Sequence, residues 1–177
     1  MTSPHPETHD GARPSSDGSS PEPPEEVARA VVLRQLSFGA RTRAQLRAKV
    51  LAKDVPDDVA DAVLDRMGEV GLVDDRQFAH DWVRSRHRSK GLSRRGLADE
   101  LRRKGVDRDL ADEALGQLDG DDERAAAERL VAKRLPSVRG LERQRAANRL
   151  MGMLARKGYP AGLAGEVVRQ ALAADDA

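Results

Sequence analysis

The sequence contains one unit written three times, and this repeat restricts the possible folds more than any other feature. Ser93 stands 51 positions after Thr42, and each residue opens a segment in which leucine and valine recur at matching places. The apolar residues at equivalent positions are Leu46, Leu97 and Leu150; Val50, Leu101 and Leu154; and Val59, Leu110 and Leu163. In the second and third copies a lysine precedes Gly105 or Gly158, which predicts a helix that ends in a left-handed glycine. A repeat of this length predicts an array in which each unit packs against its neighbour.

The composition favours several small cores between helices over one large core. Only two Phe, one Trp and one Tyr occur among 177 residues, so the chain has little aromatic mass for one thick core. It has no cysteine, which excludes disulfides, thiolate metal sites and cysteine nucleophiles. There is no apolar run long enough for a membrane span, and the N-terminal residues lack the pattern of a secretory signal. We therefore expect a cytoplasmic protein without a membrane segment.

The chain divides into a leader and three predicted units. Residues 1–25 are rich in Pro, Ser, Gly and acidic side chains without apolar periodicity, and we expect them to be disordered. Three-helix repeats are expected at 26–72, 73–119 and 120–177. The predicted fold class is all-α: three tandem three-helix repeats that form an elongated, curved body, with a disordered N-terminal tail.

Helix boundaries in the first unit carry distinct signals. Thr42 with Gln45 three residues later forms a capping-box pattern, which predicts the N-terminus of a helix. Pro56 suits the first turn of the next helix. Gly68 and Gly71 are expected to end that helix.

Charge is laid out in blocks, although the formal net charge is only +1. An acidic stretch at 107–123 separates two basic regions. The first basic region comprises Arg84, Arg86, Arg88, Lys90, Arg94, Arg95, Arg102, Arg103 and Lys104, and the second comprises Arg129, Lys133, Arg134, Arg139, Arg143, Arg145, Arg149, Arg156 and Lys157. Such patches attract phosphates or an acidic protein surface. The alternative is a solvated face whose arginines pair with the acidic helices beside them.

No residue pattern predicts catalysis, a metal site or a cofactor. His80 and His87 are seven apart on one expected helix, too far apart to share an ion without further ligands. The sequence has no phosphate-binding glycine loop and no nucleophile elbow. Phe78 and Trp82, four apart, could stack on bases, but their spacing beside other apolar residues favours a place in the core.

Two joined motifs resemble a known family. Residues 71–79 read Gly-Leu-Val-Asp-Asp-Arg-Gln-Phe-Ala, and residues 100–106 read Glu-Leu-Arg-Arg-Lys-Gly-Val. Together they resemble the signature of the RecX family, bacterial proteins that regulate the recombinase RecA, and the resemblance extends from about Val27 to Leu172. It implies a small, monomeric, non-enzymatic modulator without a cofactor. Such a protein lodges in the groove of the RecA filament on single-stranded DNA, and inhibits ATP hydrolysis, strand exchange and the coprotease activity of the SOS response.

The resemblance also implies a contact face for the RecA filament, and for single- or double-stranded DNA. Its expected members are Arg84, Arg86, Arg88, Arg94, Arg95, Arg102, Arg103 and Lys104, with Arg145, Arg149, Arg156 and Lys157 as a second group. One alternative is a helix-turn-helix regulator that reads DNA directly through residues 46–70, with Pro56 at the start of its recognition helix. Another is a helical scaffold that binds a protein partner without DNA.

Overall fold

The computed structural model describes residues 22–175 of the chain. Within this range the backbone forms nine α-helices and a short 3₁₀ helix, and no strand. The α-helices are α1 (Pro24–Leu36), α2 (Arg43–Leu51), α3 (Asp57–Glu69), α4 (Asp75–Lys90), α5 (Arg94–Arg103), α6 (Arg108–Leu115), α7 (Gly120–Arg134), α8 (Arg143–Arg156) and α9 (Ala161–Asp175), and η1 (Leu135–Ser137) follows α7. The all-α prediction is confirmed. Most of the leader predicted at 1–25 lies outside the described residues, and α1 already begins at Pro24.

Each set of three consecutive helices encloses its own apolar core. We call α1–α3 the first unit, α4–α6 the second and α7–α9 the third. Leu46, Leu97 and Leu150 recur in the sequence because each is completely buried on the middle helix of its unit. Complete burial of a leucine side chain contributes roughly 1.5–3 kcal/mol. The repeat therefore encodes one packing solution that is used three times.

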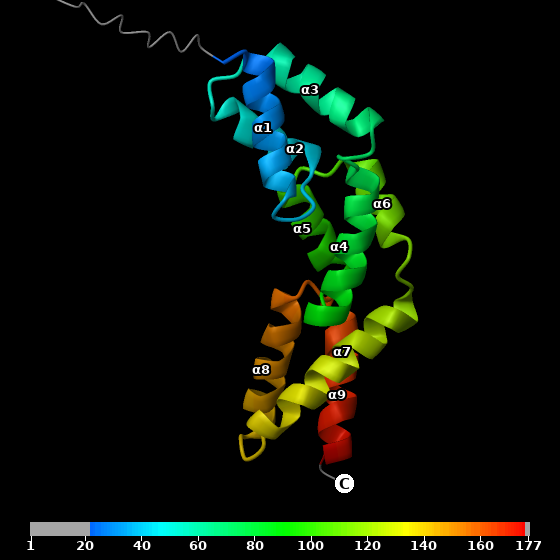
Figure 1. Ribbon diagram of the computed structural model, residues 1–177. Coiled ribbons are helices and arrows are strands. Elements are labelled where there is room, and N and C mark those ends of the chain that lie inside the picture. The colour runs from blue at the N-terminus through cyan, green and yellow to red at the C-terminus, as the bar shows by residue number, and fades with distance from the viewer. Residues whose placement is uncertain (1–21, 176–177) are drawn as a thin grey trace, which may run out of the picture.

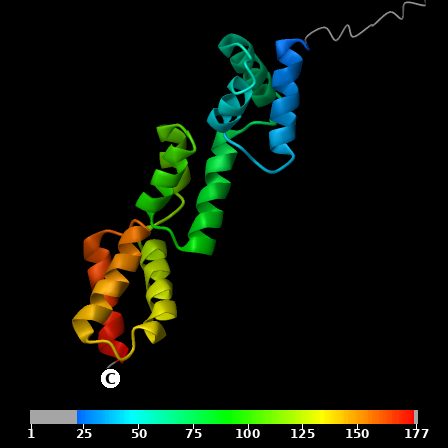
Figure 2. The ribbon, with the colours of Figure 1, turned by 90° about the vertical axis from the view of Figure 1, so that its left-hand side faces the viewer.

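The units follow one another along a single long axis (Figures 1 and 2). Helix α1 and the C-terminal end of α9 lie at opposite ends of the body, and α4 runs along the axis between the first and third units (Figure 1). The second unit lies to one side of the line that joins the first and third units, so the path of the three units bends (Figure 1). The prediction of an elongated, curved array is thus confirmed.

The capping signals place most helix starts. At α2, the Thr42 hydroxyl accepts the backbone N–H of Gln45 at 3.2 Å, and the Gln45 side chain accepts the backbone N–H of Thr42 at 3.2 Å. This is the predicted capping box. At α5, the Ser93 hydroxyl accepts the backbone N–H of Gly96 at 3.1 Å. Each cap satisfies backbone donors that would otherwise lack a partner at a helix N-terminus.

One boundary prediction was wrong. Gly68 does not end its helix, because α3 continues to Glu69 and only Gly71, with φ +73°, takes the left-handed conformation. A glycine inside a helix costs about 1 kcal/mol relative to alanine. The burial of Met67 in the core of the first unit offsets that cost and keeps the last turn helical.

Candidate functional site

Two predicted contact residues, Arg86 and Lys104, lie against the ring of Trp82. The Lys104 Nζ is 3.9 Å from the ring centroid and the Arg86 Cζ is 4.2 Å from it. Burial lowers the pKa of Lys104, and the nearby Arg86 charge lowers it further. Cations in this position are attracted by the negative face of the indole ring. Both side chains therefore help to hold the second unit together.

The Trp82 ring is itself fixed by neighbours on two helices. It stacks on Phe78 with a centroid separation of 5.5 Å, and its Nε1–H donates to the Glu100 carboxylate at 2.8 Å. Phe78 is buried in the core of the second unit and Trp82 packs against that core. The predicted core position is confirmed for Phe78, and Trp82 is partly buried against the same core.

Other predicted arginines have partners of two kinds. Arg84 and Arg102 form exposed ion pairs with the acids three residues earlier, Asp81 at 3.0 Å and Asp99 at 3.1 Å. Such surface pairs contribute little to stability and exchange easily for another anion. Arg94 is different, because its guanidinium donates to the Leu118 backbone carbonyl at 3.0 Å and so ties α5 to the segment that follows α6.

Six of the predicted contact residues are exposed, and within residues 22–175 their guanidinium groups have neither a hydrogen bond nor an ion pair with another residue. They come from α4, α5 and α8: Arg88, Arg95, Arg103, Arg145, Arg149 and Arg156. The three on α8 lie 4, 7 and 11 residues apart, so they share one face of that helix. Lys157, by contrast, donates its ammonium to the backbone carbonyl of Lys90, and burial lowers its pKa. The unpaired arginines are the groups best placed to meet an external anion.

The first joint between units was not anticipated from the sequence. The Thr42 hydroxyl at the start of α2 donates to the backbone carbonyl of Lys104 at the end of α5, at 2.6 Å. Beside it, the backbone N–H of Arg43 donates to the Asp75 carboxylate at 2.7 Å. Burial raises the pKa of Asp75, while the hydrogen bond from Arg43 opposes that shift. The N-terminus of α2 is thus bound to both α4 and α5 of the next unit.

The second joint repeats this chemistry one unit further along. The backbone N–H of Ser93, at the start of α5, donates to the Lys157 carbonyl at the end of α8, at 3.1 Å. The next backbone N–H, of Arg94, donates to the Glu123 carboxylate on α7 at 2.9 Å. The hydroxyl of Tyr159 adds a bond to the Gly91 carbonyl at 3.0 Å.

Both joints require a glycine in the following unit. A Cβ on Gly158 would lie 2.6 Å from the backbone nitrogen of Gly96, and a Cβ on Gly105 would lie 2.4 Å from the Cβ of Ala44. The corresponding residue in the first unit is Asp54, whose φ of 57° gives it the same left-handed backbone with a side chain attached. The sequence signal for the joints was therefore present in the repeated lysine–glycine pairs, where it was attributed to helix termination alone.

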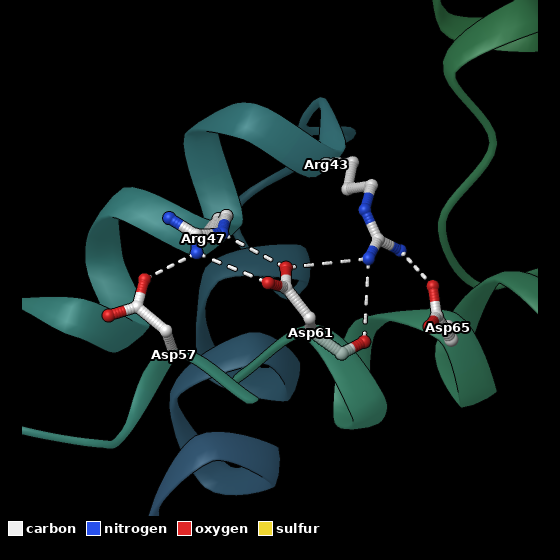
Figure 3. Close-up of polar contacts among 5 residues, drawn as sticks. All are labelled: Arg43, Arg47, Asp57, Asp61 and Asp65. Carbon is white, nitrogen blue, oxygen red and sulfur yellow. Dashed lines mark hydrogen bonds and ion pairs between the residues drawn. The ribbon is translucent and has the colours of Figure 1, made fainter. Parts of the chain in front are cut away.

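The first unit carries a separate ion network between α2 and α3 (Figure 3). The Arg47 guanidinium donates to the Asp61 carboxylate at 2.9 and 3.1 Å and also to Asp57. Arg43 pairs with Asp61 at 3.5 Å and with Asp65 at 2.7 Å. The hydrogen bonds from Arg47 lower the pKa of Asp61, with smaller contributions from the two arginine charges. The two arginines of α2 are consequently paired with acids of α3.

Residues 22–175 contain no cluster of three or more His, Cys, Asp or Glu side chains able to hold a metal ion. His80 instead contacts the Glu113 carboxylate at 3.3 Å and the Gln117 side chain at 2.6 Å. In the same range no helix is long and apolar enough to cross a membrane.

The three units match three family models in chain order. Residues 28–67 match the first three-helix domain of RecX, residues 74–115 the second and residues 121–171 the third. The chain belongs to the RecX family, a family of helical regulatory proteins.

Relatives named Regulatory protein RecX are similar over nearly the whole chain. The one from Streptomyces coelicolor is 48% identical over 171 residues, which cover 94% of this chain and 91% of the relative. The one from Thermobifida fusca is 49% identical over 162 residues, which cover 92% and 88%. The crystal structure of RecX from Lactobacillus salivarius aligns with a TM-score of 0.74 over 83% of this chain and 96% of that one. Its sequence identity of 18% makes it a likeness of fold alone.

Proposed function

We propose that this chain is a negative modulator of the recombinase RecA in DNA repair and recombination. It binds in the groove of the filament that RecA forms on single-stranded DNA, and it inhibits ATP hydrolysis, strand exchange and the coprotease activity that triggers the SOS response. The observation that carries the proposal is the ordered match of all three units to the RecX domains. In this proposal the chain acts as a cytoplasmic monomer and performs no catalysis of its own.

The geometry supports this mode of action. A helical filament repeats its subunits along a groove, and an elongated body can contact several of them at once (Figure 1). Weak contacts that are linked in this way reinforce one another, because each later contact forms within one complex. The second joint matters here, since hydrogen bonds such as that from Ser93 to the Lys157 carbonyl fix the distance between the contact faces of the second and third units.

Charge supports the same assignment. The unpaired arginines of α4, α5 and α8, from Arg88 to Arg156, give the second and third units exposed positive groups, whereas the arginines of α2 are paired with α3. Positive surface attracts both acidic protein surface and DNA phosphate, and it accelerates encounter with either. We therefore assign the filament contact to the second and third units.

The helix-turn-helix alternative receives less support. Its recognition helix would be α3, which has the sequence DDVADAVLDRMGE with five acidic residues and one arginine. Acidic side chains repel the phosphates that flank the major groove, whereas helices that read DNA rely on positive charge nearby. Two of these acids, Asp61 and Asp65, also point toward Arg43 (Figure 3).

The test is ATP hydrolysis by RecA from the same organism on single-stranded DNA, titrated with this chain. We expect inhibition at well below one chain per recombinase subunit, because one bound chain affects subunits beyond those it touches. Hydrolysis that continues unchanged at equimolar chain, with the filament formed and the chain folded, would overturn the proposed function.

A further inference from the structure

A cavity of about 480 Å³ lies between α5 of the second unit and the start of α9 in the third. Its lining includes Arg95 and Arg103 from α5 and Arg156 from the end of α8, with Tyr159, Pro160 and Ala161 on the side of the third unit. The cavity therefore borders the second joint, and three of the six unpaired arginines line it.

The acids in the same lining are already bonded to other groups. Asp99 pairs with Arg102 at 3.1 Å, and Glu100 accepts the Trp82 Nε1–H at 2.8 Å and pairs with Arg86 at 3.5 Å. Within residues 22–175 the guanidinium groups of the three lining arginines have no hydrogen bond or ion pair. The lining thus holds three unpaired guanidinium groups, and its two carboxylates are paired with Arg86 and Arg102, which lie outside it.

Two further features suit an anion in this place. The first turn of α9 carries no acidic residue, so the positive end of that helix adds to the potential of the arginines. Arg95 and Arg103 are eight residues apart on α5, which places them roughly 12 Å apart along the helix axis. An extended anion with several charges fits this spacing better than a single small ion does.

We propose that this cavity, which we call the joint groove, binds the phosphodiester backbone of single-stranded DNA. The planar guanidinium of arginine matches the oxygens of a phosphate and can bind two of them at once. A recess between two helical units admits a flexible strand, and positive grooves that follow the backbone are the usual means of binding single strands. The choice of DNA as the ligand rests on the proposed function, because a filament on single-stranded DNA brings that strand close to the chain.

The joint groove also links DNA binding to the shape of the body. Arg95 and Arg103 belong to the second unit and Arg156 to the third, so one bound strand contacts both units. A ligand that needs both sides of a joint stabilises the arrangement in which they are correctly spaced. Bound DNA therefore stabilises the second joint with Arg95 and Arg103 facing the same strand as Arg156.

The test is equilibrium binding of a fluorescent oligothymidylate to the full chain, without recombinase. The groove variant is Arg95→Gln, Arg103→Gln and Arg156→Gln together. The matched control is Arg34→Gln, Lys49→Gln and Lys53→Gln, which removes the same charge from exposed positions of the first unit. We expect the groove variant to bind at least about tenfold more weakly than the parent, and the control to stay within about threefold.

Salt dependence supplies a second readout. Each phosphate neutralised on a single strand contributes about 0.7 to the slope of log affinity against log salt, so the groove variant should lose about 2 from that slope. Arg95→Gln and Arg156→Gln should also be non-additive when combined, because both arginines contact one strand across the joint.

Three results would overturn the joint groove. The first is a loss of oligonucleotide affinity in the control variant equal to that in the groove variant. The second is additive effects of Arg95→Gln and Arg156→Gln on that affinity. The third is unchanged oligonucleotide binding by a groove variant that no longer binds the filament. The last result would assign the arginines to acidic groups of the recombinase. Because the assay contains no recombinase, failure of the joint groove leaves the ATP hydrolysis test of the proposed function unaffected.

Discussion

Gly105, in the turn after α5, packs directly on Ala44, in the first turn of α2. A Cβ at position 105 would lie 2.4 Å from the Cβ of Ala44. The two residues belong to different units, so this contact sets how closely the first and second units approach. The hydrogen bond from Thr42 to the Lys104 carbonyl lies immediately beside it.

Gly105→Ala should destabilise the chain more than Gly71→Ala does. Both glycines have positive φ, +75° and +73°, but a Cβ at Gly71 would have no atom within 4 Å. Gly71→Ala therefore incurs only backbone strain of roughly 1–2 kcal/mol. Gly105→Ala adds a steric clash across the joint, and urea unfolding measures the difference.

A second substitution makes this prediction specific. Ala44→Gly removes the atom that the new methyl group would meet, so combining it with Gly105→Ala should recover about 1–3 kcal/mol relative to additive effects. If the two changes add without any recovery, the close approach of Ala44 and Gly105 does not determine the joint.

Thr42→Val should weaken the same joint through lost hydrogen bonds. Valine keeps the branched shape but cannot donate to the Lys104 carbonyl or accept the backbone N–H of Gln45. We expect a loss of about 1–3 kcal/mol in the free energy of unfolding. Thr42→Ser keeps the hydroxyl, as Ser93 does in the second unit, and should be clearly less damaging. Equal losses for valine and serine would show that the hydroxyl contributes nothing.

Tyr159 should titrate well above the ordinary range of a tyrosine. Burial raises the pKa of this phenol to about 12, with a smaller contribution from the charge of Glu123. As it is the only tyrosine in the chain, ultraviolet absorbance of the tyrosinate reports it alone. An apparent pKa near the ordinary value of about 10 in the folded chain would contradict the burial and the bond to Gly91.

The same shift predicts a loss of stability in alkali. The unfolded chain releases the phenolic proton at about pH 10, whereas the folded chain retains it to about pH 12. Between these values the unfolded state binds fewer protons, so the free energy of unfolding falls as the pH rises. In Tyr159→Phe this part of the fall in the free energy of unfolding should be missing. The difference in that free energy between the wild type and Tyr159→Phe therefore separates the effect of the phenol from the titration of lysines.

Asp61→Asn should reduce stability at neutral pH and have less effect in acid. The hydrogen bonds from Arg47 lower the pKa of Asp61 in the folded chain. Its contribution is therefore complete above the unfolded pKa of about 3.9 and is lost as the pH falls through the folded pKa. Thermal unfolding across this range measures the change, with Asp58→Asn as a control on the same turn. A constant difference between wild type and Asp61→Asn at every pH would exclude the charge as its cause.

The predictable features were those with local causes. The capping box at Thr42 depends on residues three apart, and the left-handed ends at Gly105 and Gly158 follow from a single backbone requirement. The buried leucines were found through their repetition. Gly68 was misjudged because core packing outweighed a weak local preference for a helix end.

The candidate site was harder to predict from the sequence than the fold was. A run of arginines does not indicate which of them have partners, and Arg94 bonds to Leu118 while Arg95 lines a cavity. That division depends on contacts between residues far apart in the chain. The joints were missed for a related reason, since the repeated lysine–glycine pairs also have a local explanation as helix ends, whereas the Ala44–Gly105 contact spans two units.

The central claim is that this chain binds the recombinase filament, and co-sedimentation tests it most directly. RecA filaments preformed on long single-stranded DNA are pelleted with increasing amounts of the chain, beside equal amounts of DNA alone and of recombinase alone. The account predicts saturable pelleting with the filament at concentrations where neither component alone pellets the chain. A chain that stays in the supernatant while the filament pellets intact would contradict the account.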